Sequence, residues 1–316
     1  MVLTNKKEKF KISSGKLIGD QGTVIDSFDE IIYCEPQLNY SESFGFQWQK
    51  FQTTQIDHFQ NGVNQSQERF FAVTKWDREN LTNQNILEVG SGAGRFSSIV
   101  LQKTNADLFS VDYSHAVDTN FKNNAPHPRF RLFQASVYDL PFELGQFDKV
   151  FCFGVLQHTP DIKRSVECLA MMVKPEGMLI VDFYQKKGLF TKLHVKYLLR
   201  PITKRWSHSE LLNRIDRNAD RLIKAYRFLT RIGLGVLTRF LPIVDIDGTL
   251  PKNLTPQQLR EWVVLDTFDM FSPQYDQPQK LETVANWFRE FGLKEVTAEI
   301  ITYGGFNKVA TVKGIR

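Results

Sequence analysis

Cysteine is scarce in this chain of 316 residues, which has only Cys34, Cys152 and Cys168. An odd number without zinc-site spacing excludes a disulfide framework and a cysteine-ligated metal site, so we expect no metal and a reduced, cytoplasmic setting. The N-terminal "MVLTNKKEKF" lacks the apolar core of a signal peptide. No apolar run approaches the roughly 18 residues of a membrane-spanning helix, so we expect none.

Acidic residues are scarce in one stretch. Residues 186–240 contain 14 Lys or Arg and 3 Asp or Glu, a net charge of +11, whereas the whole chain has +5 and the remainder therefore −6. Apolar residues recur there at helical spacing. Three interpretations stay open: a solvated charged face, a surface for an anionic membrane or an amphipathic substrate, and a surface for nucleic acid. Few aromatic residues stand between the charges, which disfavours nucleic acid.

Short apolar runs alternate with helical patterns over residues 85–185. Strands are predicted at 85–90, 107–112, 129–136, 147–156 and 177–184, with helices at 93–104, 115–124 and 161–173 between them. This alternation indicates an α/β fold with a doubly wound parallel sheet. After a predicted helix at 278–293, two strands at 294–304 and 306–314 are joined so tightly, by Gly304-Gly305, that they must run antiparallel. We therefore expect the sheet to end in a reversed strand.

The segment "ILEVGSGAGRF" (86–96) places three glycines at alternate positions directly after a strand. It lacks the lysine of a phosphate-binding loop, and Arg95 replaces the third glycine of a dinucleotide fingerprint. Glu88 would favour a cationic ligand over a phosphate. Asp112 ends the next strand and can accept hydrogen bonds from ribose hydroxyls. The glycine turn, Glu88 and Asp112 together favour a positively charged ribonucleoside without phosphate as the ligand. S-adenosylmethionine is such a molecule.

Four segments in order, "ILEVGSGAGRF", "FSVDYS", "LPFELGQFDKVFCFGVLQHTPD" and "VKPEGMLIVDFY", resemble the successive motifs of class I S-adenosylmethionine-dependent methyltransferases. The resemblance covers residues 60–185 and resumes at 278–316. It implies a seven-stranded Rossmann-like sheet with its last strand antiparallel. It also implies a set of cofactor-binding residues: Glu88, Gly90, Ser91, Gly92 and Gly94 for the methionine and ribose, Asp112 for the ribose hydroxyls, Tyr113, Ser136 and Val137 for the adenine, and Phe153 and Gly154 near the sulfonium.

Candidate catalytic residues follow the fourth and fifth predicted strands. His158, in "LQHTPD", is a candidate general base, and its alternative role is to orient its loop. Asp182 and Tyr184 end the fifth strand, and Tyr275 and Asp276 precede the closing helix; all four are candidates to contact the acceptor or to serve the structure alone. The fourth strand carries Phe151-Cys152-Phe153-Gly154 in place of the D/N-P-P-Y pattern of nucleobase amine methylation, so an oxygen or carbon acceptor fits better than nitrogen.

The chain is therefore divided into an N-terminal extension at 1–60, a cofactor-binding core at 61–185, a basic helical insertion at 186–250 and the remainder of the sheet at 251–316. We expect the extension, with its aromatic "FGFQWQKFQ", to form a lid and the insertion to cap the acceptor. The predicted function is methyl transfer to a small or medium-sized metabolite: a sugar, a quinone- or polyketide-like compound, or a lipid-linked precursor. RNA methylation and a non-catalytic S-adenosylmethionine-binding partner protein are the alternatives.

Overall fold

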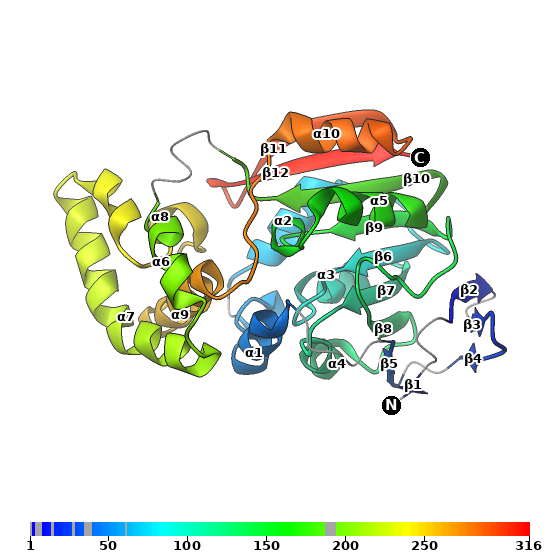
Figure 1. Ribbon diagram of the computed structural model, residues 1–316, viewed down its shortest axis with the longest axis horizontal. Coiled ribbons are helices and arrows are strands. Elements are labelled where there is room, and N and C mark those ends of the chain that lie inside the picture. The colour runs from blue at the N-terminus through cyan, green and yellow to red at the C-terminus, as the bar shows by residue number, and fades with distance from the viewer. Residues whose placement is uncertain are drawn as a thin grey trace.

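A computed structural model of the chain describes residues 2–3, 8–13, 16–26, 29–34, 40–60, 62–186 and 194–316. A twisted sheet covered by helices forms one part of the molecule, and a helical cap stands beyond one end of it (Figure 1). Parts of the predicted lid (residues 1, 4–7, 14–15, 27–28 and 35–39) and of the basic insertion (187–193) lie outside the described residues.

The central sheet has nine strands in the order β1-β5-β8-β7-β6-β9-β10-β12-β11. Every neighbouring pair is parallel except those of β12, which runs antiparallel to both β10 and β11. The predicted reversed last strand is thereby confirmed. The strands are β1 (Val2–Leu3), β5 (Ile31–Tyr33), β6 (Asn85–Val89), β7 (Asp107–Asp112), β8 (Phe130–Gln134), β9 (Phe147–Cys152), β10 (Val173–Phe183), β11 (Lys294–Tyr303) and β12 (Asn307–Ile315).

Two strands from the N-terminal extension lengthen the expected seven-stranded sheet to nine. The short apolar run of β5 pairs in parallel with β8 and covers the edge that this strand would otherwise present to water. A separate antiparallel sheet of β2 (Phe10–Ser13), β3 (Lys16–Gly19) and β4 (Val24–Ile25) packs Phe10 and Leu17 into the core beside it. The first part of the extension thus completes the core at the end opposite the cap (Figure 1).

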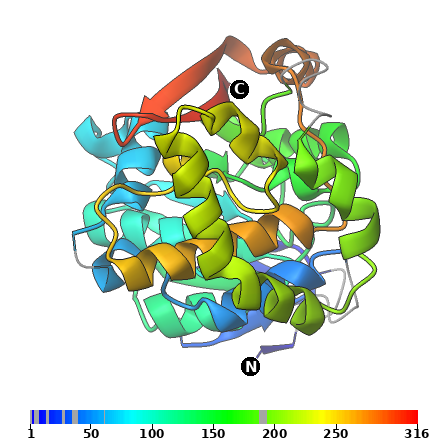
Figure 2. The same ribbon diagram turned by 90° about the vertical axis from the view of Figure 1, so that its left-hand side faces the viewer.

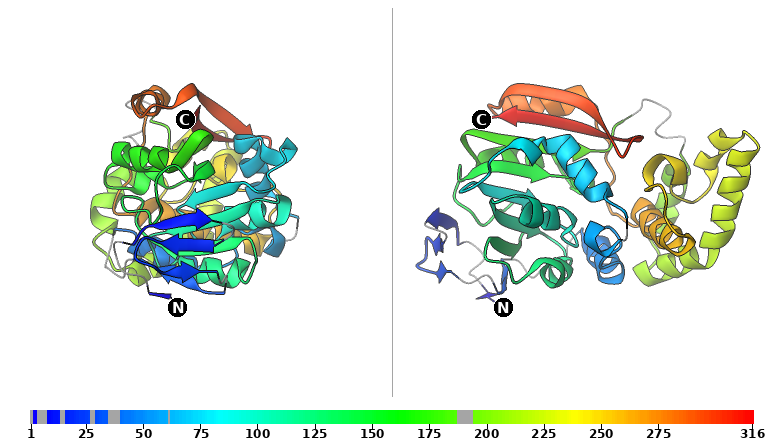
Figure 3. Two further views of the ribbon diagram at one scale, coloured as in Figure 1. Left: turned by 90° about the vertical axis from the view of Figure 1, so that its right-hand side faces the viewer. Right: turned by 180° about the vertical axis from the view of Figure 1, so that it is seen from behind.

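Helices cover both faces of the sheet, as a doubly wound fold requires. Side chains alternate along β6: Ile86 packs with helices α2, α3 and α4, whereas Leu87 and Val89 pack with α5 and α10. Figure 3 shows the first group in front of the sheet when the molecule is seen from behind. These helices are α2 (Gln65–Thr74), α3 (Arg95–Lys103), α4 (Val117–Asn124), α5 (Ile162–Met172) and α10 (Leu281–Glu290).

The cap consists of α6 (Val195–Thr203), α7 (His208–Arg231), a 3₁₀ helix (Gly235–Phe240), α8 (Ile246–Thr249) and α9 (Pro256–Phe271). Phe268 of α9 belongs to the same apolar cluster as Leu211 and Ile215 of α7, and the five elements lie over one end of the molecule (Figure 2). The helical layer therefore continues past residue 250, where the sequence pattern suggested a return to the sheet.

Helix α1 (Glu42–Lys50) lies between the sheet and the cap (Figure 1). The Phe46 ring packs against Phe268 of α9 with the ring centroids 5.6 Å apart, while Trp48 faces the turn after β6. One short helix thus contacts both parts of the molecule.

Candidate active site

The glycine turn between β6 and α3 forms one wall of the site. Gly90, Gly92 and Gly94 have left-handed backbone conformations, with φ of 83°, 52° and 86°, which glycine adopts without strain. A Cβ atom at residue 92 would stand 2.9 Å from Nε1 of Trp48. The turn therefore presents bare backbone where α1 crosses it, and any side chain at residue 92 would displace the indole.

Asp112, at the end of β7, holds this turn in place. Its Oδ2 accepts a hydrogen bond from the backbone N–H of Gly92 at 2.7 Å, and its Oδ1 accepts from the N–H and hydroxyl of Ser114 at 2.8 and 2.6 Å. Burial raises the pKa of Asp112, and these hydrogen bonds oppose the rise. The carboxylate also borders the cavity beside Tyr113, where it can accept hydrogen bonds from ligand hydroxyls.

Glu88 lies beneath the turn rather than in the cavity wall. It is 1% exposed, and its Oε2 accepts hydrogen bonds from the Ser97 and Ser110 hydroxyls at 2.5 and 2.6 Å. Burial is the main cause that raises the pKa of Glu88 from 4.5 to about 7. In this arrangement the carboxyl group ties β6 to β7 and α3, instead of meeting a cationic ligand directly.

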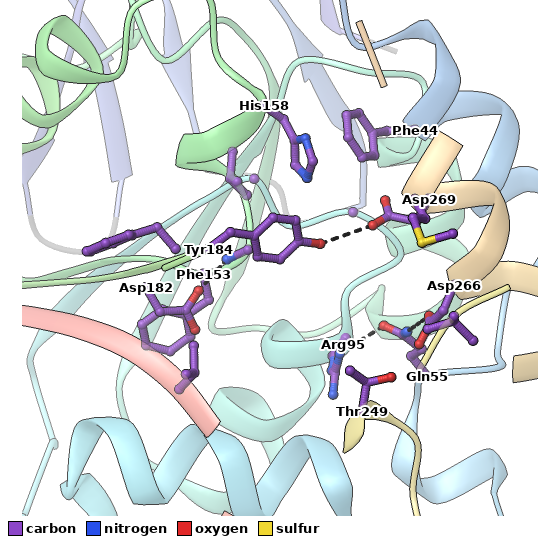
Figure 4. A pocket seen from close by; sticks show the side chains of 18 of the residues that line it. Phe44, Gln55, Arg95, Phe153, His158, Asp182, Tyr184, Thr249, Asp266 and Asp269 are labelled. Atoms are coloured by element: carbon purple, nitrogen blue, oxygen red, sulfur yellow. Dashed lines mark hydrogen bonds between the residues drawn. The ribbon is translucent and has the colours of Figure 1, made fainter. Parts of the chain in front are cut away.

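A cavity of about 1250 Å³ opens at the carboxyl ends of the parallel strands, between the turn, α1 and the cap. Open α/β sheets bind ligands at this edge. Pockets for one drug-sized molecule are roughly 300–1,000 Å³, so the cavity has room for a nucleoside and a second molecule together. Figure 4 shows polar side chains from the sheet and from α9 that converge inside it.

Most of the predicted cofactor-binding residues border this one cavity: Gly90, Ser91, Gly92, Asp112, Tyr113, Val137, Phe153 and Gly154. Glu88, Gly94 and Ser136 do not belong to its lining. A Cβ at Gly94 would meet the side chains of Asn120 and Asn124. The Ser136 hydroxyl accepts a hydrogen bond from the backbone N–H of Tyr138 at 3.2 Å. These three residues shape the turn and the loop after β8, while the other eight face the cavity.

His158 lines the cavity beyond the end of β9. Its Nδ1 lies 3.0 Å from the carbonyl oxygen of Tyr275, and because a carbonyl only accepts, Nδ1 carries the hydrogen and Nε2 is left as the basic nitrogen. The ring lies 5.0 Å from the Phe44 ring and 5.6 Å, edge to face, from the Tyr184 ring, measured between centroids. Burial lowers the pKa of His158 below 6.5, so the imidazole is neutral at pH 7.

Tyr184 lines the same part of the cavity, directly after β10. Its hydroxyl donates a hydrogen bond to Oδ2 of Asp269, on α9, at 3.2 Å. Tyr184 is 39% exposed, and its partial desolvation, followed by the nearby carboxylates, raises the pKa of the phenol above 10, so Tyr184 stays protonated. The pair joins the end of β10 to α9 of the cap across the cavity (Figure 4).

Asp182 has both carboxylate oxygens engaged by the protein. Oδ2 accepts from Nη2 of Arg69 at 2.6 Å, and Oδ1 accepts from the backbone N–H of Gly154 at 2.5 Å. Burial alone would lower the pKa of Arg69, but Asp182 raises it overall. This buried ion pair fixes the loop after β9 relative to α2, and sequence reasoning did not find Arg69.

Tyr275 and Asp276 do not belong to the cavity lining. The carbonyl group of Tyr275 orients His158, while its ring lies 5.8 Å from that of Tyr40. Asp276 is buried and pairs with Lys196 and Arg200, both on α6. Both residues therefore lie behind the cavity wall, an arrangement that favours the structural role among the two that the sequence left open.

Asp266 and Asp269 are the functional candidates that sequence reasoning missed. They stand three residues apart on α9, whose remaining turns are largely buried, and both line the cavity. Burial, followed by the Asp269 charge, raises the pKa of Asp266 from 3.8 to about 7. Gln55 donates to Asp266 Oδ1 at 3.0 Å and accepts from Nη1 of Arg95 at 2.8 Å. The signal was two acids inside the otherwise apolar run "WVVLDTFDMF".

Two negative findings apply to the part of the chain that the structure describes. It contains no cluster of three or more His, Cys, Asp or Glu side chains arranged to bind a metal ion. None of its helices combines the length and hydropathy that crossing a bilayer requires.

Comparison with known proteins finds similarity in the central part of the chain. Residues 87–181 match the protein-family model described as "Methyltransferase domain". The chain is 28% identical over 129 residues to the ubiquinone biosynthesis O-methyltransferase of Coxiella burnetii, an alignment that covers 39% of this chain and 55% of that protein. It is 30% identical over 105 residues to the tRNA U34 carboxymethyltransferase of Nautilia profundicola, which covers 33% of this chain and 35% of that protein. The chain thus spans about half, or less, of the length of these curated relatives.

Among solved structures, the chain is similar to magnesium protoporphyrin IX methyltransferase from Synechocystis. The sequence identity is 14%, and the TM-score is 0.47 over 88% of this chain and 96% of that one.

Proposed function

Since residues 87–181 match the methyltransferase-domain family model, we propose that the chain transfers a methyl group from S-adenosylmethionine to an oxygen or carbon atom of a small or medium-sized metabolite. One observation carries the proposal. The turn with Gly90 and Gly92 and the Asp112 carboxylate border the same cavity as His158, Tyr184 and Asp269. A wall suited to a nucleoside and a set of polar side chains, which includes the basic His158 and the Asp269 carboxylate, therefore face one cavity.

The residues of the first wall fit this cofactor. Bare backbone at Gly90 and Gly92 admits close approach, and the Asp112 carboxylate suits a ribose diol. Tyr40 and Tyr113, with centroids 5.5 Å apart, supply aromatic faces beside it. When bound, S-adenosylmethionine supplies a methyl group on a cationic sulfur, which keeps the electron pair of the broken bond.

His158 is suited to take a proton from an acceptor hydroxyl. The hydrogen bond from Nδ1 to the Tyr275 carbonyl fixes the ring and leaves Nε2 as the base, and the lowered pKa keeps that nitrogen unprotonated at pH 7. The Phe44 ring packs against the imidazole at an angle of 55°, and His158 is 5% exposed. Alignment of the acceptor and exclusion of water are the main requirements of such a transfer.

The cap side of the cavity suits an acceptor with both polar and apolar parts. Asp266 and Asp269 accept hydrogen bonds from hydroxyl groups, while Ile243, Val244 and Trp262 offer apolar contacts. A hydroxylated molecule with an apolar portion meets both, as quinone-like, polyketide-like and lipid-linked compounds do. The likeness to an O-methyltransferase supports oxygen as the acceptor atom.

Calorimetric titration with S-adenosylmethionine and then with S-adenosylhomocysteine tests the first half of this proposal. We expect both to bind to the wild type, and Asp112→Asn to weaken both. A panel of hydroxylated amphiphiles with isotope-labelled donor tests the second half, with His158→Ala as the matched variant that keeps the cofactor wall. If neither cofactor form binds, the proposal fails. If both bind and no acceptor in a broad panel is methylated, a non-catalytic binding role replaces it.

A further inference from the structure

The outer end of the cap carries an unusual concentration of exposed apolar side chains. Of the fourteen large hydrophobic residues that are exposed in the described parts of the chain, six lie within residues 228–240. We call this segment the apolar tip; its exposed members are Phe228, Ile232, Leu234, Val236, Leu237 and Phe240. Single exposed apolar residues are normal on a protein surface, but a contiguous group marks an interaction site.

The charged side chains within the segment that carries the apolar tip are all of one sign; the nearest acids after it in the chain, Asp245 and Asp247, lie beside Tyr226. Residues 221–240 contain five basic side chains, Arg221, Lys224, Arg227, Arg231 and Arg239, and no acidic one. The first four are exposed. An exposed apolar group within a basic surface matches the boundary of an anionic bilayer, where apolar side chains enter the acyl region and cations meet the phosphates. Nucleic acid would match the charges but not four exposed aliphatic side chains.

The cavity opens beside the apolar tip. Gly235, Val236, Thr238 and Arg239, all in the 3₁₀ helix, belong to the cavity lining. Val236 is at the same time 74% exposed, so it stands at the mouth. Figure 2 views the molecule from the cap side, where the end of α7 and the segment after it lie at the surface. A molecule leaving a bilayer in contact with the apolar tip would therefore reach the cavity without crossing bulk water.

We propose that the apolar tip docks the protein on an anionic phospholipid surface, with the mouth of the cavity toward the lipid. The acceptor is then an amphiphile resident in that bilayer, a conclusion that rests on the proposed methyl transfer. The docking itself does not depend on it. The side chains enter only the interface, in keeping with the absence, among the described helices, of one that could cross a bilayer.

Vesicle sedimentation of the full chain tests the docking. We expect sedimentation with vesicles of equal parts phosphatidylcholine and phosphatidylglycerol, little with phosphatidylcholine alone, and release by about 1 M salt, where screening is strong. Ile232→Ser/Leu237→Ser should lower the partition coefficient about tenfold, because two apolar side chains, 49% and 41% exposed, no longer enter the interface. Arg227→Gln/Arg231→Gln should lower it about 25-fold, since each of the two cations contributes roughly a fivefold factor.

Ile18→Ser/Val24→Ser is the matched control. It removes two side chains that are 43% and 58% exposed on the small sheet at the opposite end of the molecule, and we expect unchanged partitioning. Equal binding to both vesicle types, equal loss in tip and control variants, or no binding would overturn the proposal. So would a dimer, seen by light scattering, or RNA binding that the tip variants abolish, because the surface would then have another occupant.

The same samples separate this inference from the proposed function. The tip variants should bind S-adenosylmethionine as the wild type does, because none of the substituted residues lines the cavity. Vesicle binding without cofactor binding would leave the docking standing and refute methyl transfer. Cofactor binding without vesicle binding would refute the docking alone.

Discussion

Replacing Glu88 by Gln should make the stability of the protein less dependent on pH. The folded state raises the pKa of this carboxyl group from 4.5 to about 7, so its contribution to stability is fully present below 4.5 and is lost as pH rises toward 7. At 1.36 kcal/mol per pKa unit, ionised Glu88 destabilises the fold by about 3 kcal/mol at about pH 8, and by less than about 1 kcal/mol at about pH 5. Glutamine does not titrate, and its carbonyl oxygen can still accept from Ser97 and Ser110.

Urea unfolding of the wild type and Glu88→Gln at about pH 5 and about pH 8 measures the effect. The difference between their free energies of unfolding should shift by about 2.5 kcal/mol toward the variant as pH rises over this range. A change in the free energy of unfolding that the amide group causes equally at both pH values cancels when the two differences are subtracted. Glu143→Gln, an exposed acid, is the control and should show no such shift. A difference between wild type and Glu88→Gln that stays constant with pH would refute the reasoning.

The same variant also tests the role that the sequence suggested for Glu88. A residue beneath the turn should leave the Kd for S-adenosylmethionine within about twofold, whereas loss of a direct contact to a cation would cost about 1.5–3 kcal/mol. Calorimetry at about pH 8, where the wild-type carboxyl is mostly ionised, gives the sharper comparison.

Four further outcomes are expected. Asp112→Ala should weaken cofactor binding by about 1–3 kcal/mol, measured by calorimetry, and an unchanged Kd would remove this residue from the site. His158→Ala should lower kcat while the cofactor Kd stays the same, and the wild-type rate should fall on the acid side with a midpoint below 6.5; a profile flat through that region would exclude His158 as the base. Asp182→Ala should destabilise the fold by about 3–5 kcal/mol in urea unfolding, because Arg69 is left buried without its partner; a loss under about 1 kcal/mol would contradict this. Gly92→Ala should cost about 1–2 kcal/mol of stability from its positive φ and should also weaken cofactor binding by moving Trp48, and wild-type values for both would show that the turn tolerates a side chain.

The sheet and one wall of the site could be predicted because they rest on local patterns. The parallel strands are short apolar runs that alternate with helical patterns. The glycines at 90, 92 and 94 indicate a turn with positive φ angles, which glycine adopts readily. Gly304 and Gly305 likewise marked the reversal between β11 and β12. Such signals need only neighbouring residues.

Other parts of the site depend on contacts between distant residues. Arg69 and Asp182 are 113 positions apart, and no local sequence pattern indicates that the two side chains form an ion pair. Helix α9 escaped notice because it is buried on nearly every side, so its apolar residues show no helical period. Its start was nonetheless marked, since Thr255 and Gln258 form a capping box with Pro256 in the first turn. Because α9 was not predicted, Asp266 and Asp269 were not recognised as site residues. Both face a cavity that forms only in the tertiary structure.

The position of α1 has a kinetic consequence. Trp48 lies against Gly92 on the cofactor wall, Phe44 lies against His158, and Phe46 packs on Phe268 of the cap. A cofactor molecule that occupies the turn must therefore settle beneath α1, and α1 in turn forms part of the surface that an acceptor meets. We expect a compulsory order in which the donor binds first and its spent form leaves last, so that S-adenosylhomocysteine inhibits competitively against S-adenosylmethionine and noncompetitively against the acceptor. The slowest event of the cycle is then expected to be the opening of a nine-residue helix, which would make turnover sensitive to solvent viscosity.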